Sequence, residues 1–350
     1  MLRNLTIFIS LLMFWVPSCG QNSFPIYSVD IDSSVDSSPD AFFDSQKITE
    51  LKDSNGKNLF IDIFFIKPYR DGYIAVDWNY SIYIFSKDGV LRNKISRRGN
   101  GHGEYLNIID LNFSAQGNLN ILDGMKKSIL TYSQDGKYFE SRTLDFAADA
   151  FTRQREDFFF AHAYRTDSKE NMYSLLTTDN QLKVNGKFFR YNKPISIFLG
   201  ARNPFYDSPD GPVFSLVYSG INYSLSSGKP VERFRLDFGK HAVKQKILYS
   251  RINNPMDYMN LFYESGCVYF VNTHETTSHI YVDFQCSRSS YIALIDKKTG
   301  KSKVFRFKDK DICPSSYLPL AYEDGYLISI KEPDNENEAT TLITFKIKQF

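Results

Sequence analysis

The sequence predicts an all-β fold made of repeated small sheets, and three features indicate it. Tyr and Phe, which favour strands, account for 23 and 30 of the 350 residues. Short apolar stretches, about four to eight residues long, recur along the chain and end at Gly-containing turns. Finally, two successive stretches share one pattern of three strands, with Asp-Gly turns that end at Gly89 and Gly136.

The repeat has the length expected of a β-propeller, in which four-stranded sheets, called blades, surround a central channel. Equivalent turns at Gly89, Gly136, Asn180 and Gly228 follow one another at intervals of 44 to 48 residues. Repeats of about 40 to 50 residues with four short strands are typical of this fold. The chain length fits a six-bladed β-propeller. The expected units are residues 59–95, 108–146, 157–190, 213–236, 268–307 and 318–347.

Two segments depart from the repeat. Residues 240–259 interrupt it and are expected to form a helical or irregular insertion. The last unit shows only three strands, and an unpaired sheet edge is an aggregation hazard. Residues 26–31 alternate apolar and polar side chains, as a strand does. We therefore expect this N-terminal strand to join the last blade, so that residues 26–350 form one closed propeller.

The N-terminus has the pattern of an export signal. Arg3 precedes an apolar run at residues 5–16, which is too short to span a bilayer comfortably. Residues 1–18 are therefore interpreted as a signal peptide. Ser18, a small residue, stands directly before Cys19, and this resembles the lipobox of bacterial lipoproteins, although Pro17 departs from the usual box. The alternative is an ordinary secretory signal that happens to end at a cysteine.

The lipobox resemblance implies a location and an anchor. It implies that Cys19 becomes the mature N-terminus and carries the lipid, with residues 19–25 as a tether. The protein would then be an exported, membrane-anchored lipoprotein of the bacterial cell envelope, either periplasmic or at the outer membrane. The formal charge is only +2 and includes Arg3, so no nucleic-acid partner is expected.

The remaining cysteines leave two possibilities open. After Cys19 the chain has Cys267, Cys286 and Cys313, and an odd number implies at least one free thiol unless chains pair. Cys267 and Cys286 would lie nearly opposite each other in a hairpin. They would form a disulfide only if the strand geometry permits one, and otherwise they are small buried residues.

The junction between the first two units is rich in glycine. Gly99, Gly101 and Gly103 would allow a sharp crossover from one sheet to the next. Glu104 is expected to accept hydrogen bonds from backbone amides of this turn. A phosphate-binding loop would need a following helix, whereas residues 108–113 read as a strand.

This junction also carries a family resemblance. From Gly99 to Tyr105 it is similar to the Gly-x-Gly-Pro-Gly-Glu-Tyr motif of six-bladed, NHL- and TolB-like propeller lipoproteins of bacteria, with His102 in the place of Pro. The resemblance implies architecture and location more than activity. It marks a structural motif whose members are Gly99, Gly101, Gly103, Glu104 and Tyr105.

The sequence contains no catalytic constellation, and no cofactor is expected. The histidines, at positions 102, 162, 241, 274 and 279, lack metal-ligand spacing with a third ligand close by. Propeller lyases related to NHL domains resemble this fold and place zinc in the central channel, where His162 and His274 would have to meet. The alternative is that these histidines are solvated or lie in turns. Asp77, Asp123 and Asp296 end equivalent strands and would either bind calcium, as in lactonase-type propellers, or stabilise turns.

Two functions follow from these features. The first is a lipid-anchored binding or scaffolding module, expected to be a monomer, whose partner is an envelope protein, a peptide or a glycan. The alternative is a metal-dependent hydrolase or lyase with its site in the central channel. Several aromatic residues would stack on sugars or peptides if exposed on one face, and would otherwise pack between blades. They are Trp78, Tyr80, Tyr206, Tyr218 and Tyr223.

Overall fold

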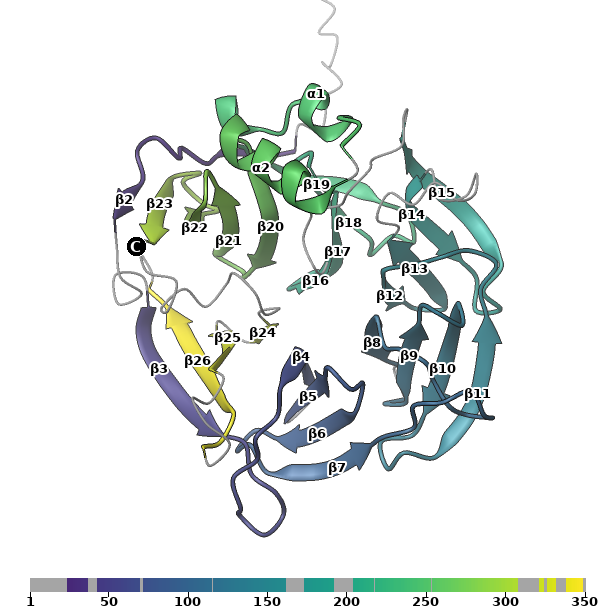
Figure 1. The fold of residues 1–350 in the computed structure, drawn as a ribbon. Helices are drawn as coiled ribbons and strands as arrows, with labels where there is room; N and C mark the ends of the chain where they lie inside the picture. The colour runs from purple at the N-terminus through teal and green to yellow at the C-terminus, as the bar shows by residue number, and fades with distance from the viewer. Residues whose placement is uncertain are drawn as a thin grey trace, which may run out of the picture.

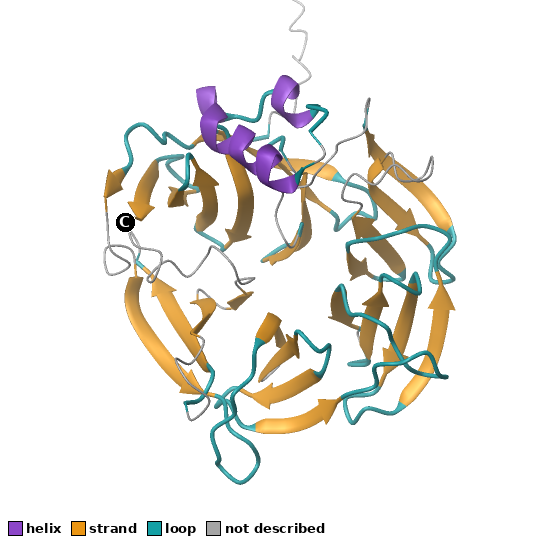
Figure 2. Ribbon diagram, viewed as in Figure 1, coloured by secondary structure: helices purple, strands orange, loops and turns teal. Residues whose placement is uncertain are grey.

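The computed structural model is a ring of six β-sheets around a central axis (Figure 1). Strands dominate, and the helices gather in one place at the edge of the ring (Figure 2). The prediction of a six-bladed β-propeller is therefore confirmed. The structure describes residues 24–36, 43–69, 72–114, 116–161, 173–191, 204–216, 218–252, 254–307, 321–323, 326–331 and 338–348.

The first three blades each contain four consecutive antiparallel strands, and the first strand of each lies nearest the axis (Figure 1). Blade one consists of β4 (Ile63–Tyr69), β5 (Gly72–Asp77), β6 (Ile82–Ser86) and β7 (Leu91–Ile95). Blade two consists of β8 (Asp110–Phe113), β9 (Leu119–Asp123), β10 (Ser128–Tyr132) and β11 (Tyr138–Thr143). Blade three consists of β12 (Ala150–Gln154), β13 (Asp157–Ala161), β14 (Tyr173–Thr178) and β15 (Val184–Arg190).

The other three blades each take a strand from the N-terminal part of the chain as their outermost member. Blade four consists of β16 (Phe205–Ser208), β17 (Gly211–Leu216), β18 (Ile221–Ser224), β19 (Val231–Asp237) and β1 (Ile26–Ser28). Blade five consists of β20 (Val268–Glu275), β21 (His279–Cys286), β22 (Ser289–Asp296), β23 (Ser302–Phe307) and β2 (Val35–Asp36). Blade six consists of β24 (Ala321–Glu323), β25 (Tyr326–Lys331), β26 (Thr341–Ile347) and β3 (Phe43–Glu50).

An N-terminal strand closes the ring, but it is β3 and not residues 26–31. β3 runs antiparallel to β26, with Glu50 opposite Thr341. β1 instead pairs in parallel with β19, where Ile26 lies opposite Arg235. The alternation at residues 26–31 is real, because every second side chain there is buried against blades four and five. The alternation therefore reflects burial of one face of the strand and does not identify its partner. β1 joins a blade that already has four strands, and as a parallel neighbour it needs no connecting turn.

Apolar side chains fill the spaces between neighbouring blades. All six residues of β5 and all five of β9 are buried, because each blade is covered on both faces by its neighbours. Outer strands such as β11 are mostly exposed. Six of the apolar clusters among the described residues each join two adjacent blades. The ring is therefore held together by six interblade layers.

The expected insertion is present between β19 and β20 and contains the helices of the described chain. These are a 3₁₀ turn, η3 (Gly239–His241), followed by α1 (Gln245–Leu248) and α2 (Pro255–Ser265), so the insertion extends beyond residue 259. The Asn254 side chain caps α2 by accepting the N–H groups of Met256 and Asp257. Gly266 ends α2 in the left-handed conformation. No helix among the described residues is long and apolar enough to cross a membrane.

Strand directions decide which loops share a face of the ring. Because strands alternate in direction, the turn after the second strand of a blade and the crossover to the next blade emerge on the same side. We call this side the crossover face. It carries the turn at residues 78–81, the junction at residues 96–109 and the insertion at residues 239–267.

Candidate binding face

The glycine-rich junction is the crossover from β7 to β8, as its sequence predicts. Gly99 N–H donates to the Tyr105 carbonyl at 2.9 Å, and Tyr105 N–H donates to the Arg97 carbonyl at 3.1 Å. The Glu104 carboxylate accepts the N–H of Gly101 at 2.7 Å. Glu104 therefore binds a backbone amide of its own turn.

The three glycines of the junction serve two different needs. Gly103 has a φ of +67°, and a Cβ there would lie 2.7 Å from the Tyr138 ring. A Cβ on Gly99 would overlap a Glu104 carboxylate oxygen, and one on Gly101 would lie 2.9 Å from it. Gly103 is thus required by the backbone conformation. Gly99 and Gly101 make room for the Glu104 carboxylate.

Tyr105 fixes the junction to blade one. Its side chain is fully buried, and its hydroxyl donates to the Tyr80 carbonyl at 2.8 Å and accepts the Arg97 N–H at 3.2 Å. Burial raises the pKa of Tyr105 to about 12, so the hydroxyl stays protonated and can donate. The Tyr132 hydroxyl donates to the Gly103 carbonyl at 2.7 Å. These polar groups bind the protein itself, which gives the motif a structural role.

The recurring aspartates stabilise turns. Asp77 accepts the Ser81 N–H at 2.7 Å, and Asp296 accepts the Thr299 N–H at 2.7 Å. Asp123 accepts the N–H groups of Met125 and Lys126 with one oxygen and that of Leu106 with the other. Among the described residues no three His, Cys, Asp or Glu side chains are grouped in a way that could hold a metal ion.

His274 lies on β20, the inner strand of blade five, and is buried. Burial lowers its pKa to about 4, so the ring is neutral near pH 7. The rings of Tyr206 and Tyr281 lie 6.5 Å and 6.1 Å away. His162 lies outside the described residues, so the alternative in which it meets His274 in the channel is not tested.

Cys286, His241 and Asp32 form an arrangement that sequence reasoning missed. Cys286 Sγ lies 3.7 Å from His241 Nδ1, and His241 Nε2 lies 3.2 Å from an Asp32 oxygen. The order matches that of a nucleophile, a base and an orienting acid. No sequence signal could have found it, since the three residues come from the N-terminal loop, the insertion and blade five.

This arrangement does not activate the thiol. His241 Nδ1 donates to the Gly266 carbonyl at 2.7 Å, so it has no free lone pair to accept the thiol proton. Cys286 Sγ donates to the same carbonyl at 3.2 Å, and burial raises the pKa of the Cys286 thiol. Both Cys267 and Cys286 are buried and free. The group therefore joins the N-terminal loop and the insertion to blade five.

Charged side chains also connect neighbouring blades. Lys67 of β4 binds Asp110 of β8 at 2.5 Å, and Asp110 accepts the Phe151 N–H from β12 at 2.9 Å. Glu275 is almost fully buried and is paired with Arg233 at 2.7 Å and Lys297 at 2.6 Å. Because each buried carboxylate has cationic or amide partners, removing one of these partners would leave an uncompensated buried charge.

An aromatic cluster lies on the crossover face of blade one, in which Trp78 is exposed and Phe64 and Tyr80 are half-buried. Trp78 is 53% exposed, and its ring lies 4.6 Å from that of Phe64. The Phe64 ring is also 6.5 Å from Tyr80, which has a φ of +64°. The Arg98 guanidinium lies 5.0 Å from the Tyr80 ring. We call Phe64, Trp78 and Tyr80 the aromatic shelf.

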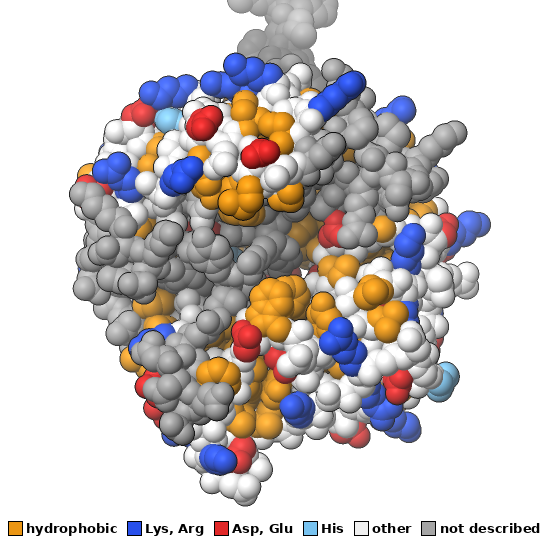
Figure 3. Space-filling view, viewed as in Figure 1, with side chains coloured by type: hydrophobic (Ala, Val, Ile, Leu, Met, Phe, Trp, Pro, Cys, Tyr) orange, Lys and Arg blue, Asp and Glu red, His pale blue; other side chains and the backbone are white. Residues whose placement is uncertain are grey.

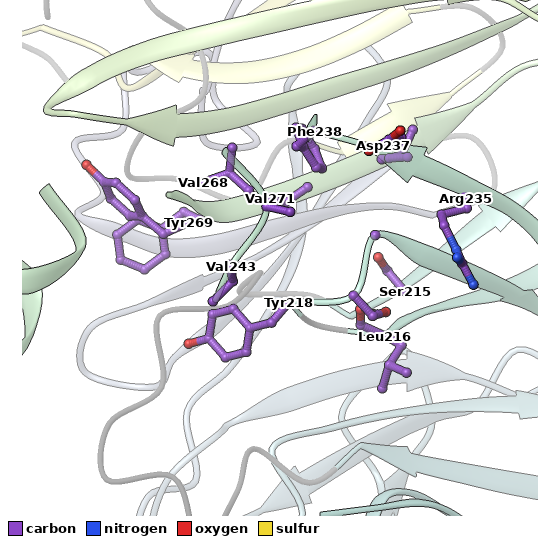
Figure 4. Close-up of a pocket in the computed structure, with 15 residues that line it drawn as sticks. Ser215, Leu216, Tyr218, Arg235, Asp237, Phe238, Val243, Val268, Tyr269 and Val271 are labelled. Carbon is purple, nitrogen blue, oxygen red and sulfur yellow. The ribbon is translucent and has the colours of Figure 1, made fainter. Parts of the chain in front are cut away.

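The other aromatic residues singled out in the sequence lie in blade four. Tyr223 is buried and its ring lies 4.5 Å from that of Phe189, so it packs in the core. Tyr206 donates its hydroxyl to Asn222 at 3.2 Å. Tyr218 lines a cavity of about 230 Å³ between blades four and five, beside the insertion (Figure 4).

Hydrophobic side chains also gather over the insertion and beside the centre of the ring (Figure 3).

Comparison with known families gives the identity of the fold. The family model described as DUF5128: 6-bladed beta-propeller matches residues 21–314. The chain belongs to this family. The family description states the architecture and nothing about ligand or activity, so the roles of the residues above rest on their geometry.

Solved structures with this fold include two bacterial proteins. A protein from Bacteroides fragilis described as exported has a TM-score of 0.76 and 17% identity, and the match covers 93% of this chain and 100% of that one. A member of the duf4221 family from Bacteroides vulgatus has a TM-score of 0.56 and 10% identity, with coverage of 87% and 97%. At these identities the likeness concerns the fold alone. No curated protein matches the sequence.

Proposed function

We propose that this member of the DUF5128 family is an exported, lipid-anchored propeller of the bacterial cell envelope that binds a ligand through the aromatic shelf on its crossover face. The observation that carries the proposal is the exposure of Trp78, which is 53% accessible and is backed by the Phe64 ring. In the rest of the described chain most large aromatic side chains fill the interblade layers.

The shelf is held rigidly enough to act as a recognition surface. The backbone N–H of Trp78 donates to the Asp62 carbonyl at 3.2 Å. The Asp77 carboxylate stabilises the same turn by accepting the backbone N–H of Ser81. Tyr80 is tied to the junction through the Tyr105 hydroxyl. A loop residue fixed by a rigid scaffold is a common place for a binding group. An exposed indole face offers stacking area to a sugar ring or a peptide side chain.

Export and anchoring are supported by the N-terminal sequence. The apolar run at residues 5–16 and the Ser18-Cys19 pair fit a lipoprotein signal. The junction motif is similar to that of NHL- and TolB-like propeller lipoproteins, and the Bacteroides fragilis neighbour is described as exported. The lipid on Cys19 would hold the ring at a membrane and leave the crossover face to meet soluble or envelope-bound ligands.

Binding assays on the purified ring test this proposal. The probes are glycan fragments and tryptic peptides, both released from bacterial envelopes, and binding is followed by calorimetry on separated fractions. We expect saturable binding of one class and at least a tenfold loss in the Trp78→Ala variant. Phe139→Ala is the matched control, because Phe139 is 48% exposed on the outer strand β11. Equal binding by both variants, or no binding of either class, would contradict the proposal.

A further inference from the structure

We infer that the cavity between blades four and five is a second binding site, which takes uncharged, mostly apolar small molecules about the size of one substituted ring. The turn after β17, the end of β19, the start of β20 and the segment of the insertion around Val243 surround it (Figure 4). The cavity belongs to blades four and five and the aromatic shelf to blade one, so this inference does not depend on the function proposed above.

The walls of the cavity are apolar and come from separate parts of the chain. Tyr218 belongs to blade four, Val243 to the insertion, and Phe270 and Val271 to blade five. All four side chains are half-buried. Val243 packs both against the buried cluster between blades four and five and against the cluster around the helices of the insertion. The cavity therefore lies where these two clusters meet.

The volume of the cavity sets the size of the ligand. At about 230 Å³ it exceeds the roughly 150 Å³ that holds a benzene molecule. It stays below the roughly 300 Å³ at which cavities for drug-sized ligands begin. A single ring with a short substituent fits these limits.

Two aromatic residues with positive φ line this cavity from different blades. Tyr218, in the turn after β17, has a φ of +64°. Phe270 has a φ of +50° and lies in an irregularity of β20, where the register with β21 shifts between Tyr269 and Asn272. Such conformations are unfavourable for aromatic residues and concentrate at ligand sites, where surrounding structure maintains them. Their meeting at one cavity favours a binding role over a simple packing gap.

The two charged residues beside the cavity do not face into it. Phe234 and Leu236 of β19 pack toward blade five. Because side chains alternate along a strand, Arg235 and Asp237 point to the opposite face of blade four. Figure 4 shows Arg235 directed away from the other lining side chains. Every other lining residue that the structure describes is uncharged. A charged ligand would lose its hydration here without gaining a counter-charge, so the cavity favours uncharged ligands.

Ser215 gives the cavity a polar group. Its neighbours Phe214 and Leu216 pack toward blade three, so Ser215 lies on the face of β17 toward blade five. The Ser215 hydroxyl makes no hydrogen bond to any residue that the structure describes. A hydroxyl both donates and accepts hydrogen bonds, and it would bond to a hydroxyl group on the ligand.

Calorimetric titration of the folded protein near pH 7 tests the inference with three compounds of similar size, 2-phenylethanol, the 2-phenylethylammonium ion and 3-phenylpropionate. We expect the alcohol to bind saturably and each ion to bind at least tenfold more weakly. Ser215→Ala should weaken binding of the alcohol several-fold, because it removes one hydrogen bond. Val243→Trp should fill the cavity and abolish binding. The matched control is Val231→Trp, since Val231 is 54% exposed on β19 of blade four. Circular dichroism confirms that each variant is folded.

A measurement on the unaltered protein keeps the inference testable if Val243→Trp does not fold. The valine methyl resonances of Val243, Val268 and Val271, which line the cavity, should shift when 2-phenylethanol is added. Those of Val90, in blade one, should not. Trp78→Ala should bind the alcohol like the unaltered protein, which separates this site from the aromatic shelf. No saturable binding of the alcohol, equal binding of either ion, or unchanged binding in a folded Val243→Trp variant would overturn the inference.

Discussion

Gly103 shows how a single residue determines the crossover between blades. Its φ of +67°, and the 2.7 Å that would separate a Cβ at this position from the Tyr138 ring, would both penalise a side chain. We predict that Gly103→Val lowers the free energy of unfolding by more than the roughly 1 to 3 kcal/mol expected from backbone strain alone. Urea unfolding followed by circular dichroism measures it.

The control for this prediction is Gly300→Val. Gly300 has a φ of +71°, but a Cβ there meets no atom within 4 Å. Its replacement should show the strain penalty without the clash. Equal losses of stability in the two variants would mean that the contact with Tyr138 has no energetic weight.

Asp283 should make stability depend on pH. Its carboxyl is buried, one oxygen accepts from Asn272 at 2.8 Å and the other has no hydrogen-bond partner among the described residues. Burial raises the pKa of Asp283 to about 8. Because the folded pKa exceeds the unfolded value, this group favours the folded state most below about pH 4, and stability is lost as the pH rises toward 8.

Replacing Asp283 by Asn removes this titration and keeps an acceptor for Asn272. We predict that Asp283→Asn becomes more stable relative to the unaltered protein as the pH rises from 4 to 8, by on the order of a few kcal/mol over that range. Thermal melts at several pH values measure the difference. A difference that stays constant across this range would show that Asp283 is ionised in the folded protein. His274, whose pKa is lowered to about 4, has the opposite sign and remains in both proteins.

At the residue scale the sequence predicts local roles better than distant ones. The turn-forming role of Asp77, Asp123 and Asp296 follows from their position at strand ends, and so does the bond from Glu104 to its own turn. The proximity of Cys286, His241 and Asp32 depends on the folding of blade five, the insertion and the N-terminal loop. No spacing rule joins residues so far apart in the chain.

At the scale of elements, the sequence pattern does not reveal the inner strands of two blades. β12 and β16 are four or five residues long, and β16 reads Phe-Tyr-Asp-Ser, without a clear apolar run. These strands lie nearest the axis (Figure 1), and each is only partly buried, so its apolar pattern is weak. The second and third strands of a blade are buried on both faces, so their apolar runs are easier to predict.

The closing strand provides a test at this scale. β3 pairs with β26 over seven positions, whereas β1 pairs with β19 over three. We predict that a chain starting at residue 38, which keeps β3, remains a folded monomer with a reduced melting temperature. A chain starting at residue 51 loses β3, exposes the edge of β26 and should aggregate. Light scattering and thermal melts compare the two, and similar behaviour of both chains would refute closure by β3.

At the scale of the whole molecule, six interblade layers make the ring, and the length of the sequence repeat predicts their number. The location of the protein is a separate matter that depends on Cys19. We predict that Cys19→Ala shifts the protein from the membrane pellet to the soluble fraction, since the acyl group is the proposed anchor. Cys313→Ala is the matched control and should remain in the pellet. Retention of the Cys19 variant after a high-salt wash would contradict lipid anchoring.

The exposure of Trp78 on the crossover face is the central claim, and fluorescence measures it directly. The chain has two tryptophans, Trp15 and Trp78, and Trp15 lies in the expected signal peptide. Emission of the protein without residues 1–18 therefore reports Trp78 alone. We predict red-shifted emission that acrylamide quenches readily, and protection from quenching when a ligand of the shelf is added. Blue-shifted emission that resists acrylamide in the free protein would show that Trp78 is buried, and would contradict the proposed binding face.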